Sequence, residues 1–186
     1  MKETKRTLEF TLVRAELTAS PEKRLLRTNL ICVDLIWPRA GIAKKSAARE
    51  MTGKKGVVDF SKEEWVKRVL FREEVLSHCG VAISVTEPVT IQLARRFLRL
   101  TAKYALKMGA DFTEKAMVGY ADIASSPIDA LAQMLGEKDT PKAIAQGVLD
   151  LESLPDAGEV KVLSVPLVRP QSSTVIGRVT LEVRGE

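Results

Sequence analysis

The residue pair with the clearest capacity for chemistry is His78 and Cys79, the only histidine of the chain followed by one of its two cysteines. A histidine base close to a thiol can generate the thiolate that acts as a nucleophile. Adjacent residues on a strand point to opposite faces, however, so these two side chains are poorly placed to hydrogen-bond. A cysteine-dependent enzyme built around Cys79 is therefore the third of three functional hypotheses.

The sequence contains few of the residues that other catalytic or metal-binding sites require. One histidine is too few for a histidine-based metal site or a Ser-His-Asp triad, and Cys32 and Cys79 form no CxxC pair. The aspartates are scattered without the spacing of a calcium loop. The segment 53–56, GKKG, lacks the first glycine and the hydroxyl residue of a phosphate-binding loop. We therefore predict a protein that is not an enzyme, with no catalytic residue, no metal and no cofactor.

Positive charge is concentrated in two stretches of the chain, Arg39–Lys55 and Val89–Met108. Each stretch has a net charge of +5, and the whole chain also has a net charge of +5. The residues outside the two stretches must therefore carry a net negative charge. Such patches can contact phosphates or acidic protein surfaces. The candidate binding residues are Arg39, Lys44, Lys45, Arg49, Lys54, Lys55, Arg96, Arg99, Lys103 and Lys107.

Two hypotheses explain these patches, and a merely solvated surface is the plain alternative. The first is a non-enzymatic structural or interaction protein with a basic docking surface for an acidic protein partner or for self-assembly into a homo-oligomer. The second is a nucleic-acid-binding protein that contacts phosphates. Against the second, aromatic residues make up only 5% of the chain, and Phe97 and Tyr104 lie on an apolar stripe rather than offering a stacking platform.

The element that must position the second stretch is a helix predicted over Val89–Met108. Arg96, Arg99, Lys103 and Lys107 share one face, and the helix is expected to end before Gly109. The opposite face carries an apolar stripe that must be buried, formed by Leu93, Phe97, Leu100, Tyr104 and Met108.

Strands are predicted at both ends of the chain. Alternating residues indicate a half-buried strand over Thr7–Leu17, and Leu25–Ile36 follows it after a turn, so we expect the two to form a hairpin. Leu25–Ile36 is apolar on both faces, which is typical of the middle of a sheet. Glu159–Val168 and Thr174–Val183 are predicted as the last two strands, with a kink at Gly177.

Between these ends the signals are mixed. The stretch Arg39–Lys55 is expected to be an irregular surface loop. Ser61 and Glu64 have the spacing of a capping box for a helix from Lys62, whereas Val69–Val75 fits a helix or a strand. Gly80–Thr86 is predicted as a strand. Helices are expected over Thr113–Ile123 and after Ser126. Thr140 and Pro141 start either a short helix or a run that becomes a strand over Ala145–Leu151.

Strands at the ends with helices between them favour an α+β class over a doubly wound sheet. We predict one domain over residues 1–186: an antiparallel β-sheet or sandwich from the N- and C-terminal strands with a helical insertion at about 89–150. The charged N-terminus resembles no secretory signal, and no stretch is apolar enough to be an integral membrane segment, so a cytoplasmic location is expected.

Overall fold

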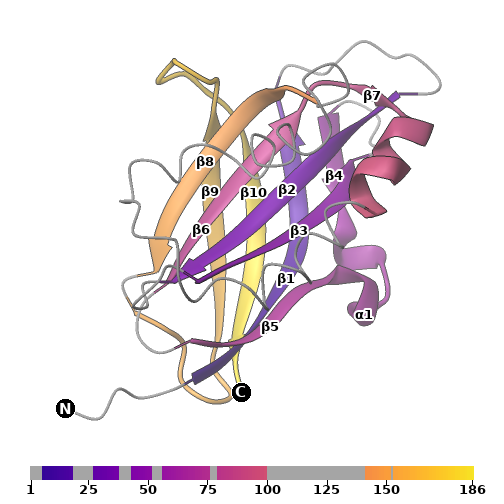
Figure 1. Ribbon diagram of the computed structural model, residues 1–186. Coiled ribbons are helices and arrows are strands. Elements are labelled where there is room, and N and C mark those ends of the chain that lie inside the picture. Colours follow the sequence, from indigo (N-terminus) through magenta and orange to yellow (C-terminus); the bar gives the residue numbers. More distant parts are fainter. Residues whose placement is uncertain are drawn as a thin grey trace.

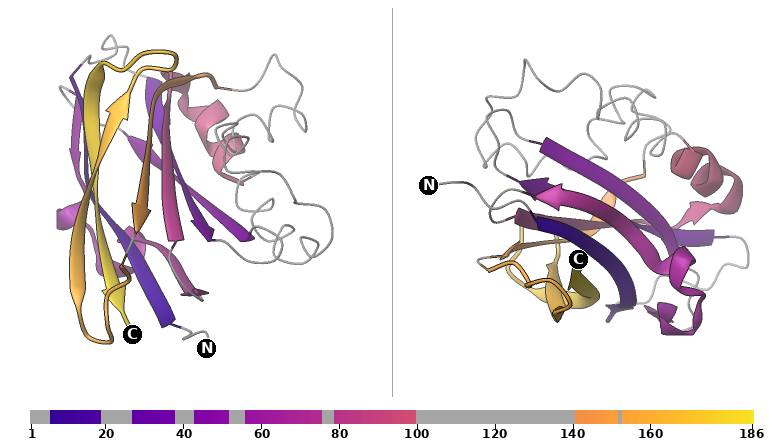
Figure 2. Two further views of the ribbon diagram at one scale, coloured as in Figure 1. Left: turned by 90° about the vertical axis from the view of Figure 1, so that its left-hand side faces the viewer. Right: turned by 90° about the horizontal axis from the view of Figure 1, so that it is seen from below.

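The computed structural model describes residues 6–18, 27–37, 43–51, 56–75, 79–99, 141–151 and 153–186. Within these ranges the protein consists mostly of antiparallel strands arranged in two facing layers, with few helices (Figures 1 and 2). The strands are β1 (Arg6–Leu17), β2 (Arg27–Trp37), β3 (Ala43–Met51), β4 (Val57–Asp59), β5 (Val69–Val75), β6 (Cys79–Thr86), β7 (Val89–Thr90), β8 (Ala143–Leu151), β9 (Val160–Val168) and β10 (Val175–Gly185).

The hydrogen-bonded strands follow the order β3-β2-β6-β8-β9-β10-β1-β4, with β5 also paired to β1 and β7 to β2. One layer contains β3, β2, β6 and β8, and the other contains β9, β10, β1, β4 and β5. The layers join where β8 meets β9, at the single described pair Gln146 and Val168. A Cβ atom at Gly147 would overlap the backbone oxygen of Pro166, so this close crossing requires a glycine.

The main hydrophobic core lies between the two layers because both present their apolar residues inward. Phe10 of β1 packs edge-to-face on Phe71 of β5, with ring centroids 6.3 Å apart. The buried residues that form this core in the two central strand pairs are Leu8, Phe10, Leu12, Val179, Leu181 and Val183 from β1 and β10, and Ile31, Val33, Leu35, Val81, Ile83 and Val85 from β2 and β6.

Strand β2 is buried on both faces, which confirms its predicted place in the middle of a sheet. Ile31 and Val33 contribute to the main core, whereas Leu30 and Cys32 belong to a second cluster on the outer face of the same layer. β3 and β6 flank β2 on its two edges.

The predicted hairpin between the first two strands is wrong. β1 pairs with β10, β4 and β5, and β2 pairs with β3, β6 and β7, so the two strands lie in different layers. Alternation of apolar residues shows which face of a strand is buried, but it does not show which strand lies beside it.

The basic stretch predicted as an irregular loop contains strand β3. Its nine residues pair with β2 from Asn29 opposite Met51 to Trp37 opposite Ala43. The central residues Ser46, Ala47 and Ala48 are too small to give a strong alternating pattern, yet they fit the space beside the long β2. The strand is therefore fixed by its neighbour rather than by a local signal.

The capping box predicted from Ser61 and Glu64 does not form. The Ser61 backbone N–H donates instead to Asp59 Oδ1 at 2.9 Å, which caps a short 3₁₀ turn at Phe60–Lys62. The helix that follows, α1 (Trp65–Arg68), has one turn and no side-chain cap, and Val69–Val75 adopts the strand alternative as β5.

The remaining strand predictions are confirmed. β6, β9 and β10 lie where the sequence indicated, and Ala145–Leu151 adopts the strand alternative as part of β8. The expected kink at Gly177 is a shift in the pairing of β10 with β9 between Val175 and Gly177.

The antiparallel sheet from N- and C-terminal strands is therefore observed, whereas the helical insertion is supported only at its start. A helix occupies 91–99, and strand β8 begins at Ala143, which places the end of the insertion before 150. The helices predicted over Thr113–Ile123 and after Ser126 lie outside the described residues. In the described ranges, no helix is long and apolar enough to cross a membrane.

Candidate functional site

The 91–99 helix begins immediately after β7. Val89 and Thr90, predicted to be helical, form β7 and pair with β2 instead. The Leu93 backbone N–H donates to Thr90 Oγ1 at 3.3 Å, so a threonine caps the first turn. This short strand fixes the start of the helix against the outer face of β2.

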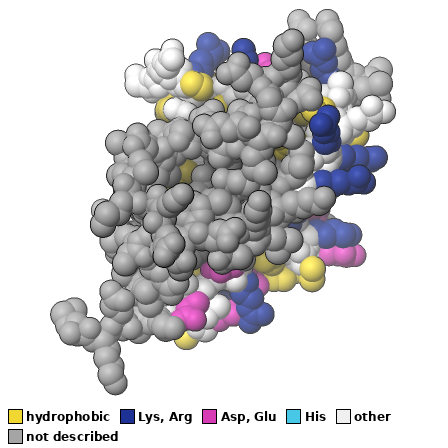
Figure 3. Space-filling view, in the orientation of Figure 1, with side chains coloured by type: hydrophobic (Ala, Val, Ile, Leu, Met, Phe, Trp, Pro, Cys, Tyr) yellow, Lys and Arg dark blue, Asp and Glu magenta, His cyan; other side chains and the backbone are white. Residues whose placement is uncertain are grey.

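The two faces of the helix match the prediction as far as the structure describes it. Phe97 is only 1% exposed and packs with Leu30 and Cys32 of β2, while Leu93 lies half-buried against the same cluster. Arg95, Arg96 and Arg99 are exposed. Figure 3 shows Lys and Arg side chains gathered along the right-hand edge of the molecule, where Figure 1 places this helix and α1.

The two basic stretches meet in space at a groove beside the helix. Its volume is about 440 Å³, and its lining comes from β3, β5 and the helix. We call this groove, together with the neighbouring Arg95 and Arg99, the basic groove. Its lining residues are Ser46, Ala47, Ala48, Arg49, Glu50, Leu70 and Leu98.

The predicted binding residues occupy different environments. Arg96 and Arg99 are exposed on the helix, and Arg49 is half-buried in the groove. Lys44 and Lys45 belong to strand β3, although their side chains are outside the described part. The residues that lie wholly outside the described ranges are Arg39, Lys54, Lys55, Lys103 and Lys107.

Arg49 links the two layers rather than standing free on the surface. Its Nη2 donates to the backbone oxygen of Val69 in β5 at 3.0 Å. Its Nε atom is buried and has no hydrogen-bond partner among the described residues. A buried guanidinium donor without an acceptor is costly. The positive charge of Arg49 in the groove lining favours an anionic group there.

Sequence reasoning missed the groove itself. Two of its lining residues gave no sign of a groove. Leu70 lies in Val69–Val75, for which both a helix and a strand were predicted, and Leu98 lies in the predicted helix. The run of small residues at 46–48 was the one available signal, since small side chains leave room next to a backbone.

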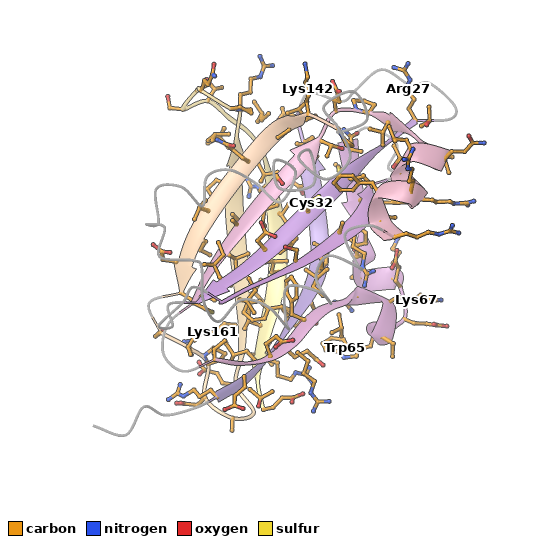
Figure 4. The ribbon with its side chains drawn as sticks, in the orientation of Figure 1. Arg27, Cys32, Trp65, Lys67, Lys142 and Lys161 are labelled. Atoms are coloured by element: carbon orange, nitrogen blue, oxygen red, sulfur yellow. The ribbon has the colours of Figure 1, made fainter. Side chains whose placement is uncertain are left out.

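The environment of Cys79 opposes nucleophilic chemistry. Its side chain is 0% exposed in the main core, and burial raises the pKa of the thiol from 9.0 to about 12. A reactive cysteine needs the opposite shift. Cys32, labelled on β2 in Figure 4, is also buried and packs with Phe97 of the 91–99 helix, while His78 lies outside the described residues. The described residues contain no group of three or more His, Cys, Asp or Glu side chains that could hold a metal ion.

Comparisons with known proteins give little further guidance. The sequence matches no family model and no curated protein. Among solved structures, the chain is similar to a C2 domain of plant Extended Synaptotagmin 1, with a TM-score of 0.46 and 14% identity over 97% of this chain and 94% of that one. At that TM-score and identity the similarity assigns neither a family nor a function to this chain.

Proposed function

We propose that this protein is a non-enzymatic interaction protein that binds an acidic protein partner through the basic groove. The observation that carries the proposal is that the groove combines apolar lining residues, Leu70 and Leu98, with Arg49 in its lining, and that the helix carrying Leu98 also exposes Arg95 and Arg99. Protein interfaces place apolar anchors inside a charged rim, and arginine is enriched in them.

Helix geometry places the exposed arginines beside the groove. Arg95 precedes Leu98 by three residues and Arg99 by four, so Arg95 is the neighbour of each of them on the helix surface. A carboxylate that contacts these arginines would therefore lie next to the apolar wall made by Leu98. The proposed surface can attract an acidic segment by charge and hold it by apolar contact.

Nucleic acid is the second candidate partner, and the same arginines are its proposed phosphate contacts. A protein that binds a duplex needs positive charges spaced along the phosphate backbone of the nucleic acid. An apolar groove adds little to the affinity of such binding. The groove's alanine and leucine lining thus favours protein over nucleic acid. Self-assembly remains a further form of the protein-docking hypothesis, and the mass of the protein in solution tests it.

The proposal is tested by comparing two probes for affinity: a labelled peptide in which glutamate alternates with threonine, and a labelled DNA duplex. Fluorescence anisotropy at low and high salt measures both. We expect the peptide to bind more tightly than the duplex at each salt concentration. Tight duplex binding that weakens steeply with salt, with no peptide binding, would favour the nucleic-acid hypothesis and contradict this one.

A further inference from the structure

The edge of β3 that faces the groove has no strand partner in the described part of the chain. Among the described strands, β3 stands at the end of the strand order and pairs with β2 alone. The backbone N–H and C=O groups of an edge strand are open to pairing with another extended chain.

The lining of the groove shows that it follows this edge. Successive side chains of a strand point to opposite faces, so a groove on one face would be lined by every second residue. Here five consecutive residues, 46–50, line it. Ala47 packs toward the main core and Ala48 toward the outer cluster, so the groove reaches both sides of the strand.

Two further features suit this edge to an added strand. Ala47 and Ala48 have small side chains, which leave the β3 backbone accessible from the groove. Arg49, which is also among the lining residues, supplies a charged side chain close to the same backbone. A carboxylate two residues along an added strand could therefore reach Arg49 while the main chain pairs with β3.

We propose that an extended acidic segment of the partner binds as an added strand along the free edge of β3. This inference rests on the proposed function and specifies how the partner binds. Main-chain hydrogen bonds to residues 46–50 supply affinity, and alternate side chains supply selectivity. Acidic side chains on one face of the segment meet Arg49, and those on the other meet Arg95 and Arg99.

Charge favours an acidic segment over a second copy of this chain. β3 has the sequence AKKSAAREM, with three basic residues and one acid. Pairing two such strands would bring like charges close together, which destabilises cross-strand pairs. A glutamate-rich strand would instead place negative charges opposite these basic residues, so the cross-strand pairs would attract each other.

The test uses two peptides of the same sequence, in which pairs of glutamates alternate with pairs of threonines so that both faces of an added strand carry carboxylates. One of the two has every backbone nitrogen N-methylated. Both carry the same charge, but only the unmodified peptide can donate main-chain hydrogen bonds to β3. We expect it to bind at least about tenfold more tightly. We also expect it to slow amide hydrogen exchange in residues 46–50.

Each other outcome has a distinct meaning. Equal affinity for both peptides would overturn strand addition and leave the proposed function standing. Failure of both peptides to bind would contradict the proposed function itself. If the protein alone forms an oligomer in which residues 46–50 are protected from exchange, a second copy occupies the edge and the inference is wrong.

A variant gives an independent check. Arg49→Gln should weaken binding of the unmodified peptide while changing the N-methylated peptide less, with folding verified by its melting curve. If Arg49→Gln unfolds, because it loses its bond to Val69, Leu98→Trp tests the same edge by narrowing the groove. Unchanged affinity in a folded Leu98→Trp variant would contradict binding in the groove.

Discussion

The Cys79 thiol lies in the core between the two layers, with none of its surface exposed. Because burial raises its pKa to about 12, the thiolate fraction near neutral pH falls far below that of a model thiol, and it rises only as the pH approaches 12. The cysteine-dependent hypothesis therefore loses its nucleophile.

This environment predicts slow chemical modification of Cys79. The native protein at neutral pH should label far more slowly than glutathione with a maleimide, whereas the unfolded protein should label at the rate of an ordinary thiol. Peptide mapping by mass spectrometry follows the label at each cysteine. Labelling of Cys79 in the native protein as fast as glutathione would restore the cysteine-dependent hypothesis.

Arg49 illustrates what residue type alone leaves open. The sequence shows a basic residue in a basic stretch, for which a solvent-exposed phosphate contact is the natural interpretation. In the fold its guanidinium bridges β3 and β5, and one of its donors, Nε, is buried with no partner in the described ranges. That role depends on a backbone oxygen at Val69, twenty residues later in the chain, which no local pattern identifies.

At the scale of elements, the 91–99 helix was predictable because its period is strong. The apolar residues recur with helical spacing, and Phe97 lies buried as that spacing required. The start of the helix was not predictable to the residue, since Val89 and Thr90 pair with β2. Long-range pairing overrides local propensity at such boundaries.

Phe97 provides the test of how the helix docks. Phe97→Ala should reduce the free energy of unfolding by about 3–5 kcal/mol, because it removes a buried ring from the cluster around Leu30 and Cys32. Thermal or urea denaturation measures this loss. As the matched control, Arg99→Ala on the exposed face should leave stability within about 0.5 kcal/mol of the unaltered protein. An unchanged melting curve for Phe97→Ala would mean that another face of the helix is docked.

β3 marks the limit of what the sequence could predict at this scale. Its run of Ser46, Ala47 and Ala48 carries weak strand propensity, and its charges resemble those of a solvated loop. Only the long strand β2 beside it, which needs a partner on each edge, gives β3 its conformation. The same small residues that hid the strand also create the groove.

At the scale of the molecule, the sequence indicated strands at both ends of the chain and their antiparallel character. It did not indicate that β1 and β2 separate into different layers, because strand order depends on pairings between distant residues. The meeting of the two basic stretches follows from that order: β3 lies on one edge of β2, and the 91–99 helix covers its outer face.

Binding of an acidic partner at the basic groove should depend on the positive charge next to it, so reversing one of these charges should weaken binding. Arg99 and Arg169 are both exposed, but Arg99 directly follows Leu98, which lines the groove, whereas Arg169 lies in the connection between β9 and β10. The matched variants Arg99→Glu and Arg169→Glu change the net charge of the protein equally. The affinity of each variant for the glutamate–threonine peptide is measured at low salt. A difference between the two affinities shows the effect of charge next to the groove, because the overall charge is the same. We predict that Arg99→Glu weakens binding by about threefold to tenfold more than Arg169→Glu. Equal weakening by both variants would contradict binding at the groove, because the peptide would then respond only to the charge of the whole molecule.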